Sequence, residues 1–185
     1  DKKMIVGACI NLSGRINTME GFSYNFFFSE NRPLNEIISE QLNLPVRLEN
    51  DTRAMAFGEY HEGVVDEEQN VIYLNYGWGV AIGIITDGNL YYGKSGYSGE
   101  FGHSNVFDND ILCQCGKMGC LETEISGWAL VNQFKEAIKE GKQSTIVLDE
   151  NATSLQHHAI IMGALQLEDT LCVELISRQS EKMGR

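Results

Sequence analysis

Short apolar runs and polar turns alternate along the first part of the chain. The apolar runs at residues 3–10 (KMIVGACI) and 44–49 (LPVRLE) predict two buried strands. Between them, residues 13–21 (SGRINTMEG) are typical of a turn, and apolar residues at helical spacing predict a helix over residues 33–42. The apolar face of this helix would comprise Leu34, Ile37, Ile38 and Leu42.

The middle of the chain predicts another helix and a hairpin. Residues 52–60 (TRAMAFGEY) are rich in helix formers and follow Asn50 and Asp51, either of which can cap a helix. Residues 70–96 contain two apolar strands that we expect to be joined at Asp87-Gly88, a strong hairpin signal.

The last part of the chain is predicted to be helical, over residues 123–140, 154–164 and 167–184. Early strands followed by later helices favour an α/β fold in two lobes. The acidic segment GVVDEEQ marks the expected boundary. We therefore assign residues 1–66 to a small N-terminal lobe and residues 67–185 to a large lobe that carries the helices.

Composition and charge narrow the possible functions. The chain has 185 residues, of which 43% are hydrophobic, and a formal net charge of -12 that disfavours direct contact with nucleic acid. No apolar run reaches the length of a membrane span, and no signal peptide is recognisable, so we expect a cytoplasmic protein without membrane contact. The chain opens on an apparent strand without an initiator methionine, as expected for a piece of a longer protein. Of its five cysteines, Cys9 and Cys172 lie in apolar sequence and are predicted to be core residues.

The remaining cysteines lie in residues 102–122 (GHSNVFDNDILCQCGKMGCLE) and predict a metal site. His103, Cys113, Cys115 and Cys120 supply the four ligands of a closed, tetrahedral zinc site. Two glycines stand between the last two cysteines, where the chain must turn tightly. The spacing Cys-x-Cys differs from the Cys-x-x-Cys of redox pairs. The plainer alternative is a turn that holds reduced cysteines beside an unrelated histidine.

Four segments in this order resemble the ROK family of sugar kinases and sugar-responsive repressors: ENDTRAMAFGEY, NYGWGVAIGII, GEFGH and CQCGKMGCLE. The resemblance covers most of the chain and is most specific at the histidine and three cysteines. It implies a two-lobed, actin-like ATPase fold related to ribonuclease H, a structural zinc, a sugar pocket between the lobes, and a homodimer or homotetramer. The chain would then be a fragment without the N-terminal phosphate loop and the C-terminal segment of the family.

The resemblance also assigns the sugar-binding residues. It implies that Glu100, His103 and Glu122 reach the sugar hydroxyls beside the zinc loop, and that Asn50 and Asp51 form the second half of the pocket. Carboxylates suit this role because each oxygen accepts hydrogen bonds from hydroxyl groups. The plainer alternatives are solvated charges for the two glutamates and a helix cap for the Asn-Asp pair.

Two further positions, Gly14 and Arg15, match a turn that touches the sugar in some relatives, although Arg15 could equally be a surface charge. In the kinases of the family, the position of Asp51 is the general base that takes the proton from the attacked hydroxyl.

The sequence argues against phosphoryl transfer by this chain. Family kinases resemble LGTGVGGG where this chain has YGWGVAIG at residues 76–83. Trp78, Ala81 and Ile82 add bulk where glycine or a small residue lets the backbone approach the phosphates.

Our leading hypothesis is the sugar-sensing effector domain of a ROK-type transcriptional regulator, closer to the NagC-like branch than to the kinases. DNA would be bound only through a helix-turn-helix outside this chain, and the ligand would be a hexose or amino sugar, or its phosphate. The main alternative is an ATP-dependent hexose or N-acetylamino-sugar kinase that uses ATP and magnesium. A third possibility is a zinc-stabilised oligomerisation module with an inactive pocket.

Overall fold

A computed structural model describes residues 4–24, 31–65 and 67–184 and divides the chain into two compact units. Unit 1 comprises Asp1–Asn75 and Ala81–Glu100, and unit 2 comprises Tyr76–Val80 and Phe101–Arg185. The predicted assignment of residues 1–66 and 67–185 to two lobes of the whole protein stays a prediction.

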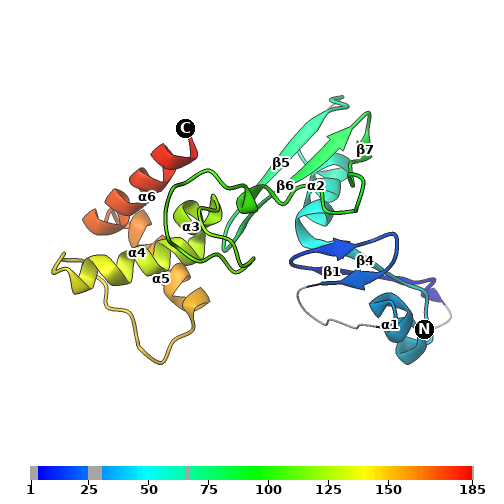
Figure 1. Cartoon of the computed structure of the whole chain (residues 1–185), viewed down its shortest axis with the longest axis horizontal. Coiled ribbons are helices and arrows are strands. Elements are labelled where there is room, and N and C mark those ends of the chain that lie inside the picture. Colours follow the sequence, from blue (N-terminus) through cyan, green and yellow to red (C-terminus); the bar gives the residue numbers. More distant parts are fainter. Residues whose placement is uncertain (1–3, 25–30, 66, 185) are drawn as a thin grey trace. The chain divides into compact units, whose positions relative to one another are not determined.

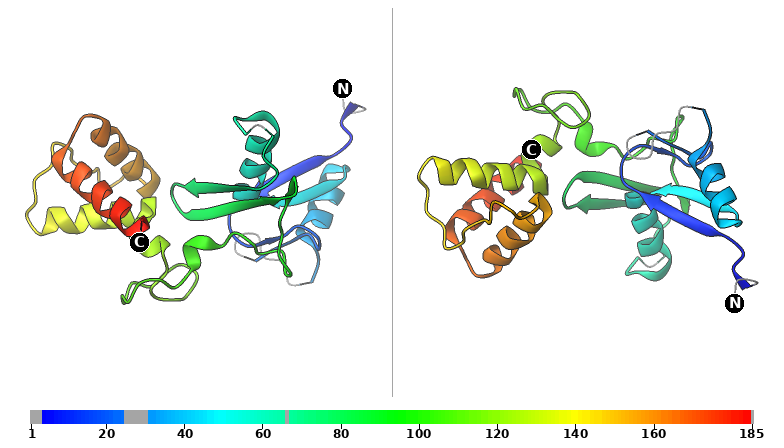
Figure 2. Two further views of the ribbon diagram at one scale, coloured as in Figure 1. Left: turned by 90° about the horizontal axis from the view of Figure 1, so that it is seen from above. Right: turned by 90° about the horizontal axis from the view of Figure 1, so that it is seen from below.

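Unit 1 is built around a parallel pair of strands (Figure 1). β1 (Ala8–Leu12) pairs with β4 (Val46–Asn50), so that Ala8 lies opposite Val46. Parallel strands need a crossover connection, and the predicted helix α1 (Leu34–Leu42) lies in it. The views from above and below show β1 and β4 side by side (Figure 2). The buried core of this region is formed by Ile16, Leu34, Val46 and Leu48.

The beginning of the chain differs from the prediction in two details. Residues 13–21, predicted as a turn, contain β2 (Ile16–Asn17), which pairs with β3 (Phe22–Ser23) in a small antiparallel ribbon. The prediction that Cys9 is a core residue is wrong, because its side chain is exposed. Successive side chains of a strand point to opposite faces, and the neighbours of Cys9 in β1 are the ones that pack on the core.

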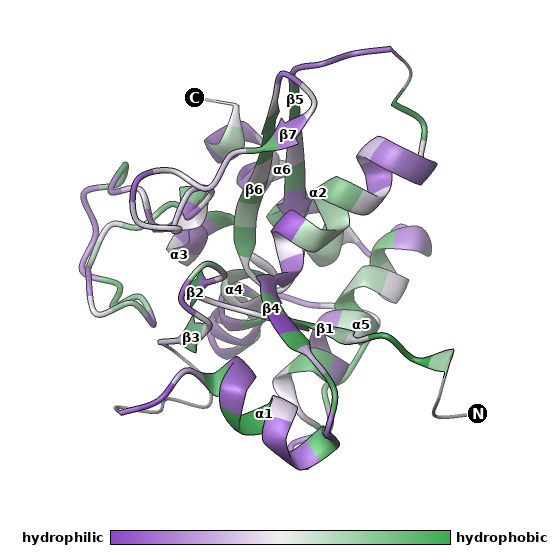
Figure 3. Ribbon diagram, turned by 90° about the vertical axis from the view of Figure 1, so that its right-hand side faces the viewer, coloured by the Kyte–Doolittle hydropathy of each residue, from purple (hydrophilic) through white to green (hydrophobic). Residues whose placement is uncertain are grey.

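The hairpin region contains three strands instead of the two predicted. These are β5 (Val71–Tyr76), β6 (Val80–Thr86) and β7 (Asn89–Leu90), in that order across the sheet. The predicted turn between β6 and β7 is confirmed, with positive φ at Asp87 (51°) and Gly88 (73°). The glycines around Trp78 add a second turn, which ends β5 and begins β6. Figure 3 shows the apolar character of β6, which carries the sequence VAIGIIT.

Helix α2 (Asp51–Glu62) packs on the sheet of β5, β6 and β7. Its N-cap is Asn50, one of the two residues predicted for this role. The contact is close at Gly83 in β6, where a Cβ atom would lie 2.3 Å from the Cβ of Ala56. A glycine is therefore required for α2 to approach the sheet at this depth.

Unit 2 is mainly helical and contains η2 (Phe101–His103), α3 (Glu122–Ile125), α4 (Gly127–Lys139), α5 (Ser154–Gln166) and α6 (Thr170–Met183). The helix predicted over residues 123–140 is interrupted at Ser126, whose side chain caps α4 by accepting from the Ala129 N–H. Cys172 is fully buried, as predicted. The core of α4, α5 and α6 is formed by Leu130, Val131, Phe134, Ala137, Ile161, Ala164, Leu171, Cys172 and Leu175.

Candidate functional site

The four predicted metal ligands converge within unit 2. The ligand atoms of His103, Cys113, Cys115 and Cys120 all lie within 4.8 Å of one another. Cys113 Sγ is 3.5 Å from His103 Nδ1, and Cys115 Sγ is 3.5 Å from Cys120 Sγ. Tetrahedral zinc with bonds of about 2.0–2.3 Å would separate its ligand atoms by roughly 3.5–3.8 Å. The donor set and its spacing therefore fit a zinc ion.

Two glycines make this convergence possible. Gly116 has a φ of 85° and donates its N–H to the Cys113 carbonyl at 2.9 Å, which turns the chain back between two ligands. Gly119 has a φ of 72°, and a Cβ atom there would lie 2.2 Å from the Phe107 carbonyl oxygen. A larger residue at Gly119 would push the chain away from this carbonyl just before Cys120.

The thiols of the cluster differ in their affinity for protons. Burial raises the pKa of Cys113, and burial followed by the neighbouring Cys115 raises that of Cys120. Burial acts in the same direction on Cys115, but hydrogen bonds from the Lys117 backbone and the other two thiols lower its pKa overall. Cys115 is therefore the first of the three thiols to lose its proton as the pH rises, and a divalent cation would favour deprotonation of all three.

Glu122, in the first turn of α3, is held beside the cluster. Its side chain is only 9% exposed, and Oε1 lies 3.7 Å from His103 Nδ1 and 3.6 Å from Cys113 Sγ. The other oxygen accepts from the Val80 N–H at 3.3 Å. The backbone at Gly102 lies close to Val80. A Cβ atom at Gly102 would meet the Val80 carbonyl oxygen at 2.2 Å, so only a glycine allows this approach. Glu122 is therefore a fixed, buried carboxylate and not the solvated charge of the plainer interpretation.

A second group of predicted residues lies in unit 1. Asn50 donates from Nδ2 to the Gly14 carbonyl at 3.0 Å and accepts the Arg53 N–H on Oδ1 at 3.0 Å. Asp51, the first residue of α2, accepts a short hydrogen bond of 2.5 Å from the Ser13 hydroxyl on Oδ2. The structure thus brings Gly14, Asn50 and Asp51 together at the start of α2 and adds Ser13 to them.

Arg15 and Glu100 are the remaining residues predicted to bind the sugar. The side chain of Arg15 is exposed. Glu100 is half-buried and follows Gly99, whose φ is 93° and where a Cβ atom would lie 2.0 Å from the Ile82 carbonyl oxygen. The Ile82 N–H donates to the Gly99 carbonyl at 2.9 Å, so the chain is fixed to β6 immediately before Glu100.

A buried ion pair that the sequence analysis missed supports the start of α2. Arg53 is 2% and Glu49 is 8% exposed, and their side chains form a salt bridge of 2.7 Å. Arg53 also donates to the carbonyls of Gly96 at 2.8 Å and Ile16 at 3.0 Å. The Tyr92 hydroxyl donates to Glu49 at 2.9 Å, and burial together with this carboxylate raises the pKa of Tyr92 to about 12. Helical spacing could not reveal this pair, because Glu49 belongs to β4 and Arg53 to α2.

Comparison with solved structures defines the fold class. A ROK family glucokinase from Streptomyces griseus, in complex with glucose and AMPPNP, superposes with a TM-score of 0.79 at 29% identity, over 93% of this chain and 57% of that chain. A ROK family transcriptional regulator, a homolog of the E. coli MLC protein, gives a TM-score of 0.78 at 28% identity, over 97% of this chain and 45% of that chain. The chain has the actin-like ATPase fold of these proteins, as predicted.

The sequence profile of the ROK family matches residues 3–184, and the chain belongs to this family. The xylose repressor of Caldicellulosiruptor bescii is 36% identical over 155 residues, which cover 84% of this chain and 39% of the repressor. The chain therefore spans between 39% and 57% of the length of these three relatives. Within the described residues, no helix is long and apolar enough to cross a membrane.

Proposed function

We propose that this chain is part of the sugar-sensing effector region of a ROK-type transcriptional regulator. In this proposal a hexose or amino sugar, or its phosphate, is bound by Asn50, Asp51 and Glu100 together with His103 and Glu122. The observation that carries the proposal is the fixed carboxylate of Glu122, held between a candidate metal ligand and a backbone N–H. A carboxylate already held in place loses little conformational freedom when it accepts a hydroxyl group. Gly14 and Arg15 would complete the turn beside Asn50.

A structural zinc ion would hold the loop in place. His103, Cys113, Cys115 and Cys120 would be its ligands, and the ion would fix the orientation of the imidazole ring. In the structure it is Nδ1 of His103 that faces Cys113 and Glu122. Ligation through Nδ1 would leave Nε2 as the ring atom that contacts a sugar hydroxyl.

The turn between β5 and β6 supports a regulator over a kinase. A phosphate-binding turn needs free backbone N–H groups, but the Gly77 N–H donates to the Gly79 carbonyl at 3.1 Å and the Val80 N–H donates to Glu122. Trp78, predicted in a strand, lies in this turn and packs on the core of α4, α5 and α6. Two of the N–H groups of the turn are thus already engaged within the chain.

The second candidate function is that of an ATP-dependent hexose or N-acetylamino-sugar kinase. The similarity to the glucokinase of Streptomyces griseus supports it, as does the carboxylate of Asp51 at the start of α2. Asp51 would be the general base, and ATP with magnesium would supply the phosphoryl group.

The partners of the whole protein follow from the regulator proposal. DNA would be bound by a helix-turn-helix outside this chain, because the net charge of -12 disfavours phosphate contacts by this chain. A homodimer or homotetramer in the cytoplasm would place two such helix-turn-helix domains on DNA. Sugar binding would shift the equilibrium between two arrangements of these domains, provided that the sugar binds one arrangement more tightly.

The decisive experiment measures DNA affinity of the full-length protein by fluorescence anisotropy, with and without each of a panel of hexoses and amino sugars. We expect at least one sugar to change the DNA affinity and to bind in an independent calorimetric titration. Glu122→Gln should abolish the sugar response and leave DNA affinity without sugar unchanged. If a sugar binds and no sugar changes DNA affinity, the regulator proposal is wrong and the kinase remains.

A further inference from the structure

Two parts of the loop around the candidate metal site supply different ligands and are held together by their own backbone. Residues 103–107 carry the histidine, and residues 113–121 carry the three cysteines. The N–H groups of Val106 and Phe107 donate to the Gly119 carbonyl at 2.9 and 3.1 Å. The site is therefore formed in part by bonds that need no metal, and a residue that joins the two parts can control where the histidine lies.

The side chain of Lys117 makes such a link. Its Nζ donates to the His103 carbonyl oxygen at 2.8 Å, and its own carbonyl accepts the Cys113 N–H at 2.8 Å. Asn105 forms the reciprocal link, because its Nδ2 donates to the Met118 carbonyl at 2.7 Å. Lys117 thus contacts the backbone of two candidate ligands, one in each part of the loop.

Metal binding would change the hydrogen bonding of the same His103 carbonyl. In the structure Cys120 Sγ lies 3.7 Å from this oxygen, and a thiol there can donate to it weakly. A metal-bound cysteine is a thiolate, which has no hydrogen to donate and repels the oxygen. The Lys117 ammonium then remains as the donor to this carbonyl and keeps His103 beside the sulfur.

The ligand set leaves excess negative charge, which Lys117 lies close enough to offset. Three thiolates and one divalent cation carry one negative charge in excess, and the Glu122 carboxylate lies 3.6 Å from Cys113 Sγ. The Lys117 ammonium interacts electrostatically with the sulfurs of Cys115 and Cys120. Because negative charge removed from water is costly unless it is paired, this ammonium stabilises the metal-bound loop more than the metal-free one.

We propose that Lys117 is a positioning residue for the metal site, which it supports without being a ligand. Its ammonium holds the His103 backbone against the cysteines and offsets the excess negative charge of the metal-bound loop. Of the two links, that of Lys117 carries a charge and that of Asn105 does not, so the effect of Lys117 depends on ionic strength. The proposal concerns metal affinity and is independent of sugar sensing.

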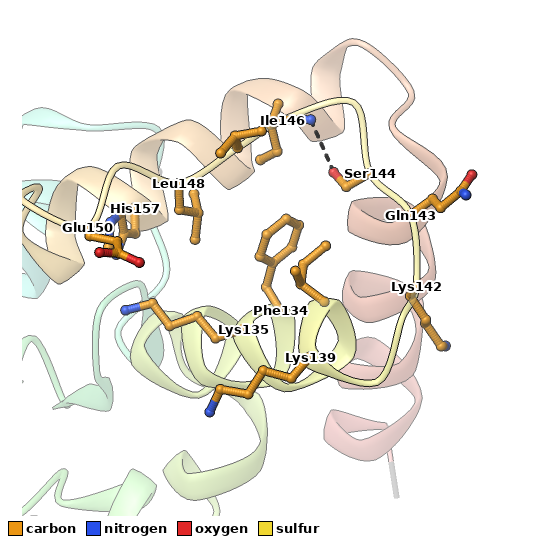
Figure 4. Close-up of a pocket in the computed structure, with 12 residues that line it drawn as sticks. Phe134, Lys135, Lys139, Lys142, Gln143, Ser144, Ile146, Leu148, Glu150 and His157 are labelled. Carbon is orange, nitrogen blue, oxygen red and sulfur yellow. Dashed lines mark hydrogen bonds between the residues drawn. The ribbon is translucent and has the colours of Figure 1, made fainter.

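The test is the zinc affinity of the full-length protein, measured by competition with a chromophoric chelator. Lys117→Met removes the charge and the donor and should lower the affinity by about tenfold or more, as for other residues that support metal ligands. Lys117→Arg keeps both and should bind zinc nearly as tightly as the wild type. The matched control is Lys139→Met, at an exposed lysine of α4 that pairs with Glu136 and lines a separate cavity (Figure 4). This control should leave the zinc affinity unchanged.

Two further measurements separate positioning by charge from a general effect on folding. Lys117 is exposed, so its substitution leaves the core of unit 2 intact, and cobalt-loaded Lys117→Met should keep the absorption bands of a tetrahedral thiolate site. The affinity ratio between wild type and Lys117→Met should shrink as the salt concentration rises from about 0.01 M to about 1 M, because the charge is screened. Wild-type affinity in Lys117→Met, or equal losses in Lys117→Met and Lys117→Arg, would overturn the proposal. A ratio that does not change with salt, loss of the tetrahedral bands, or a wild type that binds no zinc would overturn it as well.

Discussion

At the residue scale, the role of Asp51 is either that of a helix cap or that of a ligand-binding residue. Asn50 provides the cap of α2, since its side chain accepts the Arg53 N–H. The carboxylate of Asp51 is therefore not needed as the cap, and the Ser13 hydroxyl holds one of its oxygens in place. Positioning of a charged acceptor in this way is typical of a binding site.

We predict that Asp51→Asn weakens sugar binding by about 1.5–3 kcal/mol, the range for a hydrogen bond to a charged group. The helix should keep its stability because Asn50 remains as the cap. Calorimetric titration with the bound sugar measures the first effect, and thermal unfolding provides the control. Unchanged sugar affinity in a folded variant would reduce Asp51 to an ordinary first residue of a helix.

The sequence predicted single residues well where their chemistry is local. A cap at Asn50 or Asp51 and the burial of Cys172 followed from neighbouring residues alone, and the structure has the cap at Asn50. It was wrong for Cys9, because an apolar run does not tell which face of a strand meets the core. It also missed the buried pair of Glu49 and Arg53, because its burial depends on Tyr92, which is distant in the sequence.

At the scale of elements, the zinc loop should depend on its metal. We predict that Cys113→Ser lowers metal affinity by about tenfold or more, since a ligand matters at least as much as its supporting residues. Sugar binding should weaken with it, because the ion would orient His103 beside Glu122. Cys9→Ser is the matched control, since Cys9 is an exposed thiol outside the cluster.

Elemental analysis and titration of accessible thiols measure this effect. The wild-type protein and Cys9→Ser should each contain close to one zinc per chain, and Cys113→Ser should contain much less. A wild-type protein with almost no metal and all its thiols reactive would contradict the assignment of the loop.

A second prediction at this scale concerns Asp169, which caps α6 and joins it to the segment after α4. Its side chain accepts from the N–H groups of Thr145 and Cys172 and from the hydroxyls of Ser144 and Thr145. Burial alone would raise its pKa, but these hydrogen bonds hold the pKa of Asp169 well below its usual value. Ionised Asp169 therefore contributes to the free energy of unfolding at pH values above its unfolded-state pKa of about 4. This contribution is lost as the pH falls toward the lower pKa of the folded state.

We expect Asp169→Ala to lower the free energy of unfolding of unit 2 by about 2 kcal/mol near neutral pH, through the lost cap and the unsatisfied donors. Asp169→Asn should lose less stability than the wild type when the pH is lowered from about 5 to about 2. Trp78 and Trp128 both belong to unit 2, so tryptophan fluorescence in denaturant titrations reports on this unit. Parallel pH profiles of wild type and Asp169→Asn would contradict the prediction.

The elements themselves were largely predictable, and the differences have physical causes. Helical spacing predicted α1, α5 and α6, and the Asp87-Gly88 turn predicted the junction of β6 and β7. The break between α3 and α4 was missed because the carbonyls of Gly77 and Trp78 accept from the first N–H groups of α4. This contact joins positions about fifty residues apart, which no local pattern reveals.

At the scale of the whole molecule, the family and its fold followed from motifs, whereas function depends on how a shared fold is used. The relatives include both a repressor and a glucokinase, so family membership alone does not select between them. The distinction rests on whether a phosphate can approach the turn at Trp78. The sequence comparison identified Trp78 as a substitution in this turn. It did not predict the conformation of the turn, which depends on the packing of Trp78 on the helices of unit 2.

This turn leads to the prediction that separates the two functions. Because the N–H groups of Gly77 and Val80 are engaged within the chain, we expect the full-length protein to bind sugar without measurable ATP turnover. Phosphoryl transfer depends on holding phosphates and magnesium in line with the attacked hydroxyl, which a correctly placed Asp51 cannot replace. A coupled ADP-release assay with magnesium and a panel of hexoses and amino sugars measures this, with an active ROK glucokinase as the positive control. Turnover on the order of 1 per second, the lower end of ordinary kinase rates, would establish the kinase instead.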